Sequence, residues 1–84
     1  MNFELSGHAQ EELTNRSIPL QVVELILDSP GQILEEDGLK VYQGQFTATN
    51  GKIYLLRVFI NDQVNPVKVV TVYRTSKIKK YWRD

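Results

Sequence analysis

The sequence contains no cysteine, one histidine and one methionine among its 84 residues. Without cysteine the chain has no disulfide, no thiol nucleophile and no thiolate zinc site, and one histidine excludes a histidine-rich metal site. No apolar run approaches the roughly 18 residues that a membrane-spanning helix needs, and the first residues lack the pattern of a secretion signal. We therefore expect a cytoplasmic protein that has no membrane segment, no metal and no other cofactor.

The composition is that of an ordinary folded protein. Hydrophobic residues make up 42% of the chain and charged residues 24%, with five glycines and three prolines. These proportions argue against disorder, collagen-like repeats and coiled coil. The length suits one small domain with a single core, so we expect residues 1–84 to form one unit.

The charges are distributed unevenly, although the net charge is zero. Residues 1–42 carry two basic and eight acidic side chains, whereas residues 43–84 carry eight basic and two acidic ones. This distribution allows a basic surface that attracts anionic partners. The alternative is that the two halves attract each other within the fold.

The first third of the sequence predicts two helices. Ser6 is a suitable N-cap for a helix that runs to about Arg16. A second helix is predicted for residues 19–28, with Pro19 in its first turn and apolar residues at helical spacing. It ends before Pro30, because the residue preceding a proline avoids helical dihedral angles.

The rest of the sequence predicts an antiparallel sheet. Apolar runs predict strands at about 32–36, 39–47, 52–60 and 67–74. Asp37-Gly38 and Asn50-Gly51 separate the first three runs, and both pairs favour type I′ hairpin turns. Residues 75–83 predict a short C-terminal helix. The expected fold class is α+β, with two N-terminal helices packed on a four-stranded antiparallel meander.

Alternation along the strands assigns side chains to two faces, if Asn50-Gly51 is a two-residue loop and Ile60 lies opposite Val67. The first face is almost wholly apolar and suits the helices. It comprises Val41, Tyr54, Leu56, Val58, Ile60, Val67, Val69, Thr71 and Tyr73. The second face mixes cations and aromatic rings. It comprises Lys40, Tyr42, Phe46, Ile53, Leu55, Arg57, Phe59, Lys68, Val70, Val72 and Arg74.

This second face is too apolar to be left exposed. Three kinds of cover are open: Tyr81 and Trp82 of the tail, a partner protein, or RNA whose bases stack on the rings. A one-residue slip in register would exchange the assignments.

Two clusters of residues carry possible chemistry. His8, Glu12 and Arg16 are spaced four residues apart on the first helix, so they form either an ion-pair ladder or a proton-transfer group beside an anion site. The tail from Tyr73 to Arg83 contains five cations and three aromatic residues and no acidic residue. This pattern is typical either of a segment that binds nucleic acid or of a solvated basic helix at the end of a small domain. Phosphate-binding loops and serine-hydrolase motifs are absent.

Three segments resemble a known family. The sequence resembles the DUF4258 family in residues 8–13, in residues 16–18 followed by Val23, and in residues 69–74, which end in Tyr73-Arg74. That family is similar to the RelE/ParE/BrnT group of small bacterial toxins, which implies a RelE-like α+β fold. Several members of that group cleave RNA, on the ribosome or free, and are neutralised by an antitoxin. The resemblance singles out His8, Arg16 and Tyr73 but gives them no role.

We therefore expect a toxin-type endoribonuclease that needs no metal. Arg57 and Arg74 would stabilise charge, while Tyr81 or His8 would transfer protons. The residues expected to bind RNA are Lys40, Tyr42, Lys77 and Lys80. The expected partners are RNA or the ribosome and a small acidic antitoxin.

The alternative is a non-catalytic module of the same fold that binds protein or RNA. The nuclease hypothesis requires Arg57 and Arg74 to lie on one face of the sheet.

Overall fold

A five-stranded sheet forms the centre of the structure, a computed structural model that describes all residues from 1 to 84. The strand order is β1-β5-β4-β3-β2, with β1 parallel to β5 and the other neighbours antiparallel. The strands are β1 (Phe3–Leu5), β2 (Gln32–Glu36), β3 (Leu39–Thr47), β4 (Ile53–Asn61) and β5 (Val67–Thr75). The predicted α+β class and the antiparallel arrangement of β2 to β5 are confirmed, but the prediction of only four strands is wrong because β1 was missed.

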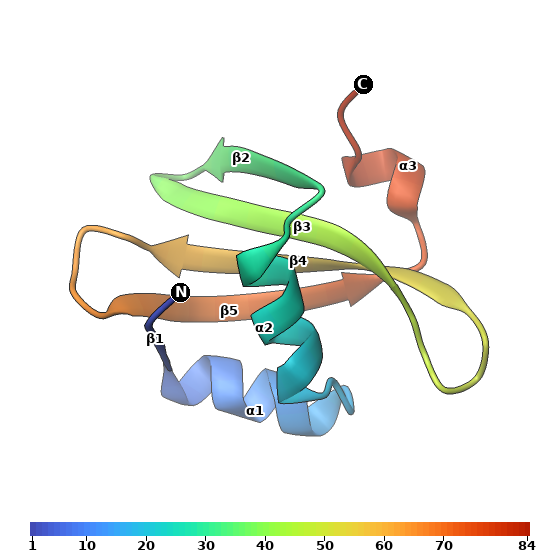
Figure 1. Ribbon diagram of the computed structural model, residues 1–84, viewed down its shortest axis with the longest axis horizontal. Coiled ribbons are helices and arrows are strands. Elements are labelled where there is room, and N and C mark those ends of the chain that lie inside the picture. The colour runs from blue at the N-terminus through green and yellow to red at the C-terminus, as the bar shows by residue number, and fades with distance from the viewer.

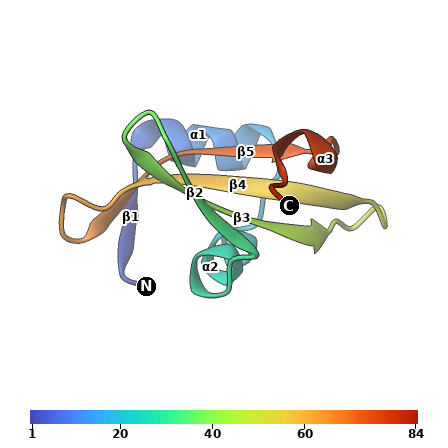
Figure 2. The same cartoon turned by 90° about the horizontal axis from the view of Figure 1, so that it is seen from above.

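The three helices lie at different places around this sheet (Figure 1 and Figure 2). Helix α2 (Leu20–Asp28) packs over β3 and β4, and α3 (Ile78–Tyr81) lies on the opposite side. Helix α1 (Gly7–Asn15) runs alongside β5, whereas the prediction placed both N-terminal helices on one face. We call the two sides of the sheet the α2 face and the α3 face. None of these helices is long and apolar enough to cross a membrane.

Ser6 fixes the start of α1 beside β5. As predicted, it is the N-cap, since its hydroxyl accepts the Ala9 N–H at 3.0 Å. The same hydroxyl donates to the carbonyl of Val70 on β5 at 2.7 Å. Ten residues of helix from Ser6 to Arg16 cover about 15 Å. Helix α1 and strand β5 run in the same direction (Figure 1). The end of α1 is therefore carried along β5 to Tyr73, three residues or about 10 Å beyond Val70, and the guanidinium of Arg16 lies 5.8 Å from the centre of the Tyr73 ring.

The turns between strands decide which side chains share a face. Asp37 and Gly38 have φ values of 52° and 78° and form the predicted two-residue turn. A two-residue turn at Asn50-Gly51 would pair Thr49 with Lys52. Residues 48–52 instead form a longer loop, and the pairing of β3 with β4 begins at Thr47 and Ile53. This change of one in register reverses the face of every β3 side chain.

A β-bulge on β5 causes a second reversal. Ile60 pairs with Val69, whereas Phe59 pairs with Thr71, so that Val70 is an extra residue on β5. Side chains after Val70 therefore lie on the face opposite to the predicted one. The predicted faces are wrong for Lys40, Val41, Tyr42, Phe46, Thr71, Val72, Tyr73 and Arg74.

The hydrophobic core fills the space between the α2 face and the helices. Its buried side chains come from α1, α2, the loop between them, β4 and β5. Gly44 on β3 makes room for α2, because a Cβ at this position would lie 2.7 Å from Cδ1 of Ile26. The buried residues of this core are Ala9, Ile18, Val23, Ile26, Leu27, Leu56, Val58, Ile60, Val69 and Val72.

Candidate functional site

Arg57 and Arg74 lie on opposite faces of the sheet. Arg57 pairs with Tyr73 across the β4–β5 ladder, whereas Arg74 pairs with Leu56 of the core. The guanidinium of Arg74 lies 4.7 Å from the ring centre of Tyr54 on the α2 face. The two arginines therefore do not form the common charge-stabilising site that the nuclease hypothesis required. The hypothesis is wrong in the form that relies on this pair, and a nuclease site in this protein would need other cations.

Arg57 is a buried structural residue on the α3 face, only 4% exposed. Its Nε donates to Oε1 of Gln43 at 2.9 Å, and its terminal nitrogen pairs with the carboxylate of Glu36. The ring of Tyr81 covers the guanidinium at 4.5 Å from the ring centre. The sequence analysis left three possible covers for the second predicted face: the tail, a partner protein or RNA. Over Arg57 the cover is the chain's own tail, through Tyr81.

Four other side chains meet beside the outer edge of β5 on the α3 face. The rings of Tyr73 and Tyr81 are 5.7 Å apart and nearly perpendicular. The guanidinium of Arg16 lies 5.8 Å from the centre of the Tyr73 ring, and Nζ of Lys80 lies 5.5 Å from the centre of the Tyr81 ring. We call Arg16, Tyr73, Lys80 and Tyr81 the β5-edge cluster.

Three elements bring this cluster together. β1 pairs with residues 67–69 of β5 only, so the later half of β5 has a free edge where α1 ends. The bulge turns Tyr73 onto the α3 face, and α3 follows directly after β5 with Lys80 and Tyr81. Glu12 holds Arg16 in place through an ion pair of 2.7 Å. This ion pair is the second half of the helix ladder that the spacing predicted.

The pKa of Tyr73 lies below the usual value of 10.0. The main cause is hydrogen bonding by the Tyr81 hydroxyl, with a further contribution from the Thr75 hydroxyl. The positive charges of Lys80 and Arg16 also favour the phenolate. Tyr73 therefore loses its proton at a lower pH than an isolated tyrosine does, so more of it is phenolate at a given pH.

The remaining candidate residues lie outside the cluster. His8 is exposed in the first turn of α1, about 12 Å of helix away from Arg16. Lys40 forms an ion pair of 2.9 Å with Asp62, and this contact raises the pKa of Lys40 and lowers that of Asp62. Tyr42 packs against the core on the α2 face. Lys77 is exposed at the start of α3, where its N–H donates to the Thr75 hydroxyl.

No three histidine, aspartate or glutamate side chains come together in a way that would hold a metal ion. The cluster instead offers two cations, a phenol whose pKa is lowered and a second phenol whose ring lies against the first. Such a set binds the phosphate of a polyanion and moves protons beside it. Half-exposed rings beside the cations also provide surfaces on which bases stack.

Sequence reasoning found the four cluster residues separately but not as a group. The family resemblance singled out Arg16 and Tyr73, and the basic-aromatic tail pointed to Lys80 and Tyr81. Thr75 was missed, as were the glutamines that hold the tail to the sheet. Their signal is weak, because glutamine at an alternate strand position is ordinary on an exposed sheet face.

One comparison with known proteins gives a match. The profile described as "Domain of unknown function (DUF4258)" matches residues 5–74. The chain belongs to the DUF4258 family. The matched region contains Arg16 and Tyr73 and ends before α3, so this DUF4258 protein supplies Lys80 and Tyr81 from outside it. No curated protein and no solved structure matches the chain.

Proposed function

We propose that the protein is a metal-independent endoribonuclease of the toxin type, with the β5-edge cluster as its active site. The observation that carries this proposal is the contact of the Tyr73 and Tyr81 rings, with Arg16 against the first ring and Lys80 against the second. The lowered pKa of Tyr73 supports it. The resemblance to the RelE/ParE/BrnT group supports the same function. An acidic antitoxin and the ribosome belong to this proposal as partners.

The two tyrosines have different proton-transfer roles in this reaction. Tyr73, as phenolate, accepts the proton of a ribose 2′-hydroxyl, and the 2′-oxygen then attacks the adjacent phosphorus. Tyr81 remains protonated and gives its proton to the 5′-oxygen as the phosphorus–oxygen bond breaks. The products are a 2′,3′-cyclic phosphate and a 5′-hydroxyl.

The two cations stabilise the charge that develops on the phosphate. Arg16 offers a planar fork of donors to the phosphoryl oxygens, and its side chain is 43% exposed, so a strand can reach it. Lys80 is exposed on α3 on the other side of the ring pair. Removing one such group from a preorganised site costs about 10²–10³ in rate.

The test is cleavage of end-labelled single-stranded RNA by the full chain in the presence of a chelator, with and without ribosomes. Tyr73→Phe keeps the ring and removes the hydroxyl, so we expect a loss of about 10²–10⁴ in cleavage rate. Tyr54→Phe is the matched control, because its hydroxyl lies on the α2 face near Asn50 and has no role in the reaction. It should cleave at the wild-type rate.

Two results would contradict the proposal. One is the absence of cleavage of both free and ribosome-bound RNA, and the other is equal cleavage by Tyr73→Phe and the wild type. RNA binding without cleavage would support the alternative, a non-catalytic binding module that uses the same cluster.

A further inference from the structure

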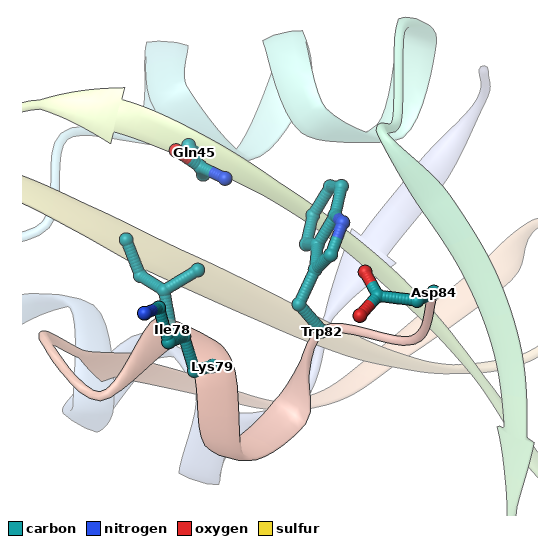
Figure 3. Close-up of a pocket in the computed structure, with 5 residues that line it drawn as sticks. All are labelled: Gln45, Ile78, Lys79, Trp82 and Asp84. Atoms are coloured by element: carbon teal, nitrogen blue, oxygen red, sulfur yellow. The ribbon is translucent and has the colours of Figure 1, made fainter.

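A pocket lies between β3, α3 and the residues that follow α3 (Figure 3). Its volume is about 630 Å³, within the usual range for small-molecule sites of about 300–1,000 Å³. Side chains from β3, from α3 and from the residues after α3 line it. They are Gln45, Ile78, Lys79, Trp82 and Asp84.

The indole of Trp82 forms a fixed wall of this pocket. The ring packs against Gly31, where a Cβ would lie 2.6 Å from the indole Cη2, so only glycine leaves the ring its present position. The backbone is held on both sides of Trp82. Gln43 donates to the carbonyl of Tyr81 at 3.1 Å, and Gln32 accepts the N–H of Arg83 at 3.0 Å.

This rigid attachment matters for binding. A ring that is already held in place loses little conformational entropy when a planar ligand stacks on it. Stacking of a base on an aromatic side chain contributes about 1–3 kcal/mol. Figure 3 shows the indole standing between Gln45 of β3 and the carboxylate of Asp84, with Ile78 on the remaining side.

Three polar side chains at the pocket have no partner within the protein. Gln45, Lys79 and Asp84 make no hydrogen bond or ion pair in the structure, and all three are exposed. An amide both donates and accepts, a carboxylate accepts only, and an ammonium donates only. Together with the indole they match a planar base that has hydrogen-bond donors at its edge and a phosphate attached.

A carboxylate at the edge of a stacked base distinguishes among the four RNA bases. It accepts two hydrogen bonds from two N–H groups that lie side by side, and only guanine has two such adjacent donors, N1–H and N2–H, on its Watson–Crick edge. Adenine and cytosine have one amino donor beside an acceptor nitrogen, and uracil has one imino donor between two acceptors.

We infer that this pocket binds a guanine base of RNA and thereby gives the nuclease its base preference. The inference rests on the proposed function in so far as the base belongs to the RNA that is cut. Helix α3 and the residue after it supply both sites. Lys79 and Trp82 line the pocket, whereas Lys80 and Tyr81 belong to the β5-edge cluster.

The experiment uses the fluorescence of Trp82, which is the only tryptophan in the chain. The full protein is titrated with the 3′-monophosphates of guanosine, adenosine, cytidine and uridine. We expect guanosine monophosphate to quench the fluorescence and to bind at least about tenfold more tightly than the other three, as a good bidentate contact allows. Equal binding of all four, or no quenching by any, would overturn the inference.

Variants separate recognition by Asp84 from general charge effects. Asp84→Asn should reduce the preference for guanosine monophosphate to less than about threefold, because the amide cannot accept both hydrogen bonds. Asp37→Asn removes the same charge from the distant β2–β3 turn, at a φ of 52° that asparagine tolerates, and should keep the preference. A preference that is unchanged in Asp84→Asn would refute the role of the carboxylate.

Gly31→Ala tests the indole platform, since the added Cβ displaces the ring. It should weaken the binding of all four nucleotides, while circular dichroism reports whether the sheet is intact. Unchanged binding by a folded Gly31→Ala protein would contradict the platform.

The outcomes for the pocket and the nuclease are independent. Selective quenching without RNA cleavage supports the pocket and refutes the nuclease. Cleavage with no quenching and no preference for sites beside guanine supports the nuclease and refutes the pocket.

Discussion

Replacing Arg57 by methionine separates a structural role for this arginine from a catalytic one. The substitution keeps the length and most of the apolar stem but removes the guanidinium. That group donates to Oε1 of the fully buried Gln43 and lies under the rings of Tyr81 and Phe59, at 4.5 and 5.3 Å from their centres. We expect a large loss of stability and a small direct effect on chemistry.

The size of the loss follows from these contacts. Leaving the Gln43 oxygen without a donor costs about 1–3 kcal/mol, and the loss of the cation–π contacts adds about 0.5–2 kcal/mol. Glu36 contributes less, because its side chain is 32% exposed and water solvates the carboxylate once the arginine is gone. The total is about 1.5–5 kcal/mol, a large part of the roughly 4–13 kcal/mol that a domain of this size has.

Urea denaturation measures this change. With a slope of about 1 kcal/mol/M, the low end for small domains, the midpoint should fall by about 1.5–5 M. Arg74→Met is the matched control. The guanidinium of Arg74 makes one cation–π contact, with the ring of Tyr54, and its loss leaves no buried acceptor without a donor. The substitution should cost about 0.5–1 kcal/mol.

RNA cleavage by the folded fraction of Arg57→Met should fall far less than cleavage by Tyr73→Phe. The reasoning is refuted if Arg57→Met is as stable as the wild type and yet loses cleavage a hundredfold. Arg57 would then be a catalytic residue.

Three further predictions concern packing, capping and pH. Gly44→Ala should lower the free energy of unfolding by about 1–3 kcal/mol in thermal denaturation, since the added Cβ would lie 2.7 Å from Cδ1 of Ile26. Adding Ile26→Val removes this Cδ1 and should restore part of the loss. Ser6→Ala removes the N-cap of α1 and its bond to β5, so denaturation should show a loss of about 1–2 kcal/mol, and an unchanged midpoint would contradict the capping role. The cleavage rate should rise with pH as Tyr73 deprotonates and level off below pH 10, because the pKa of Tyr73 is lowered. Arg16→Gln removes a positive charge that favours the phenolate, so the inflection of the pH profile should move to higher pH. An inflection that stays in place would exclude Tyr73 as the base.

Local signals in the sequence were enough to predict most of the elements. Asp37-Gly38 forms the expected turn because both residues accept positive φ, and Pro30 separates α2 from the sheet. Strand β1 was missed because three residues have no measurable periodicity. It exists as a strand only through parallel pairing with residues 67–69, more than sixty positions away in the sequence.

The faces of the sheet were harder to predict, because the error in each case is a single residue. Asn50-Gly51 is a strong signal for a two-residue turn, but the chain closes a wider loop in which Ala48 accepts the N–H of Gly51 and donates to the carbonyl of Lys52. No residue type marks Val70 as a bulge, since valine is also an ordinary strand residue. Each of these changes reverses a set of side chains while leaving the strand boundaries almost unchanged.

The bulge at Val70 also decides where the chemistry lies. With regular pairing, Arg74 would share the α3 face with Arg57, and Tyr73 would point into the core between β5 and the helices. The extra residue exchanges the two, so that Tyr73 meets Tyr81 and Arg16 at the free edge while Arg74 moves to the ring of Tyr54. Bulges are frequent beside functional sites because they re-aim side chains in this way. The cations that matter for an anionic ligand are therefore those that the fold leaves exposed at this edge, Arg16 and Lys80, rather than Arg57, which the sheet buries.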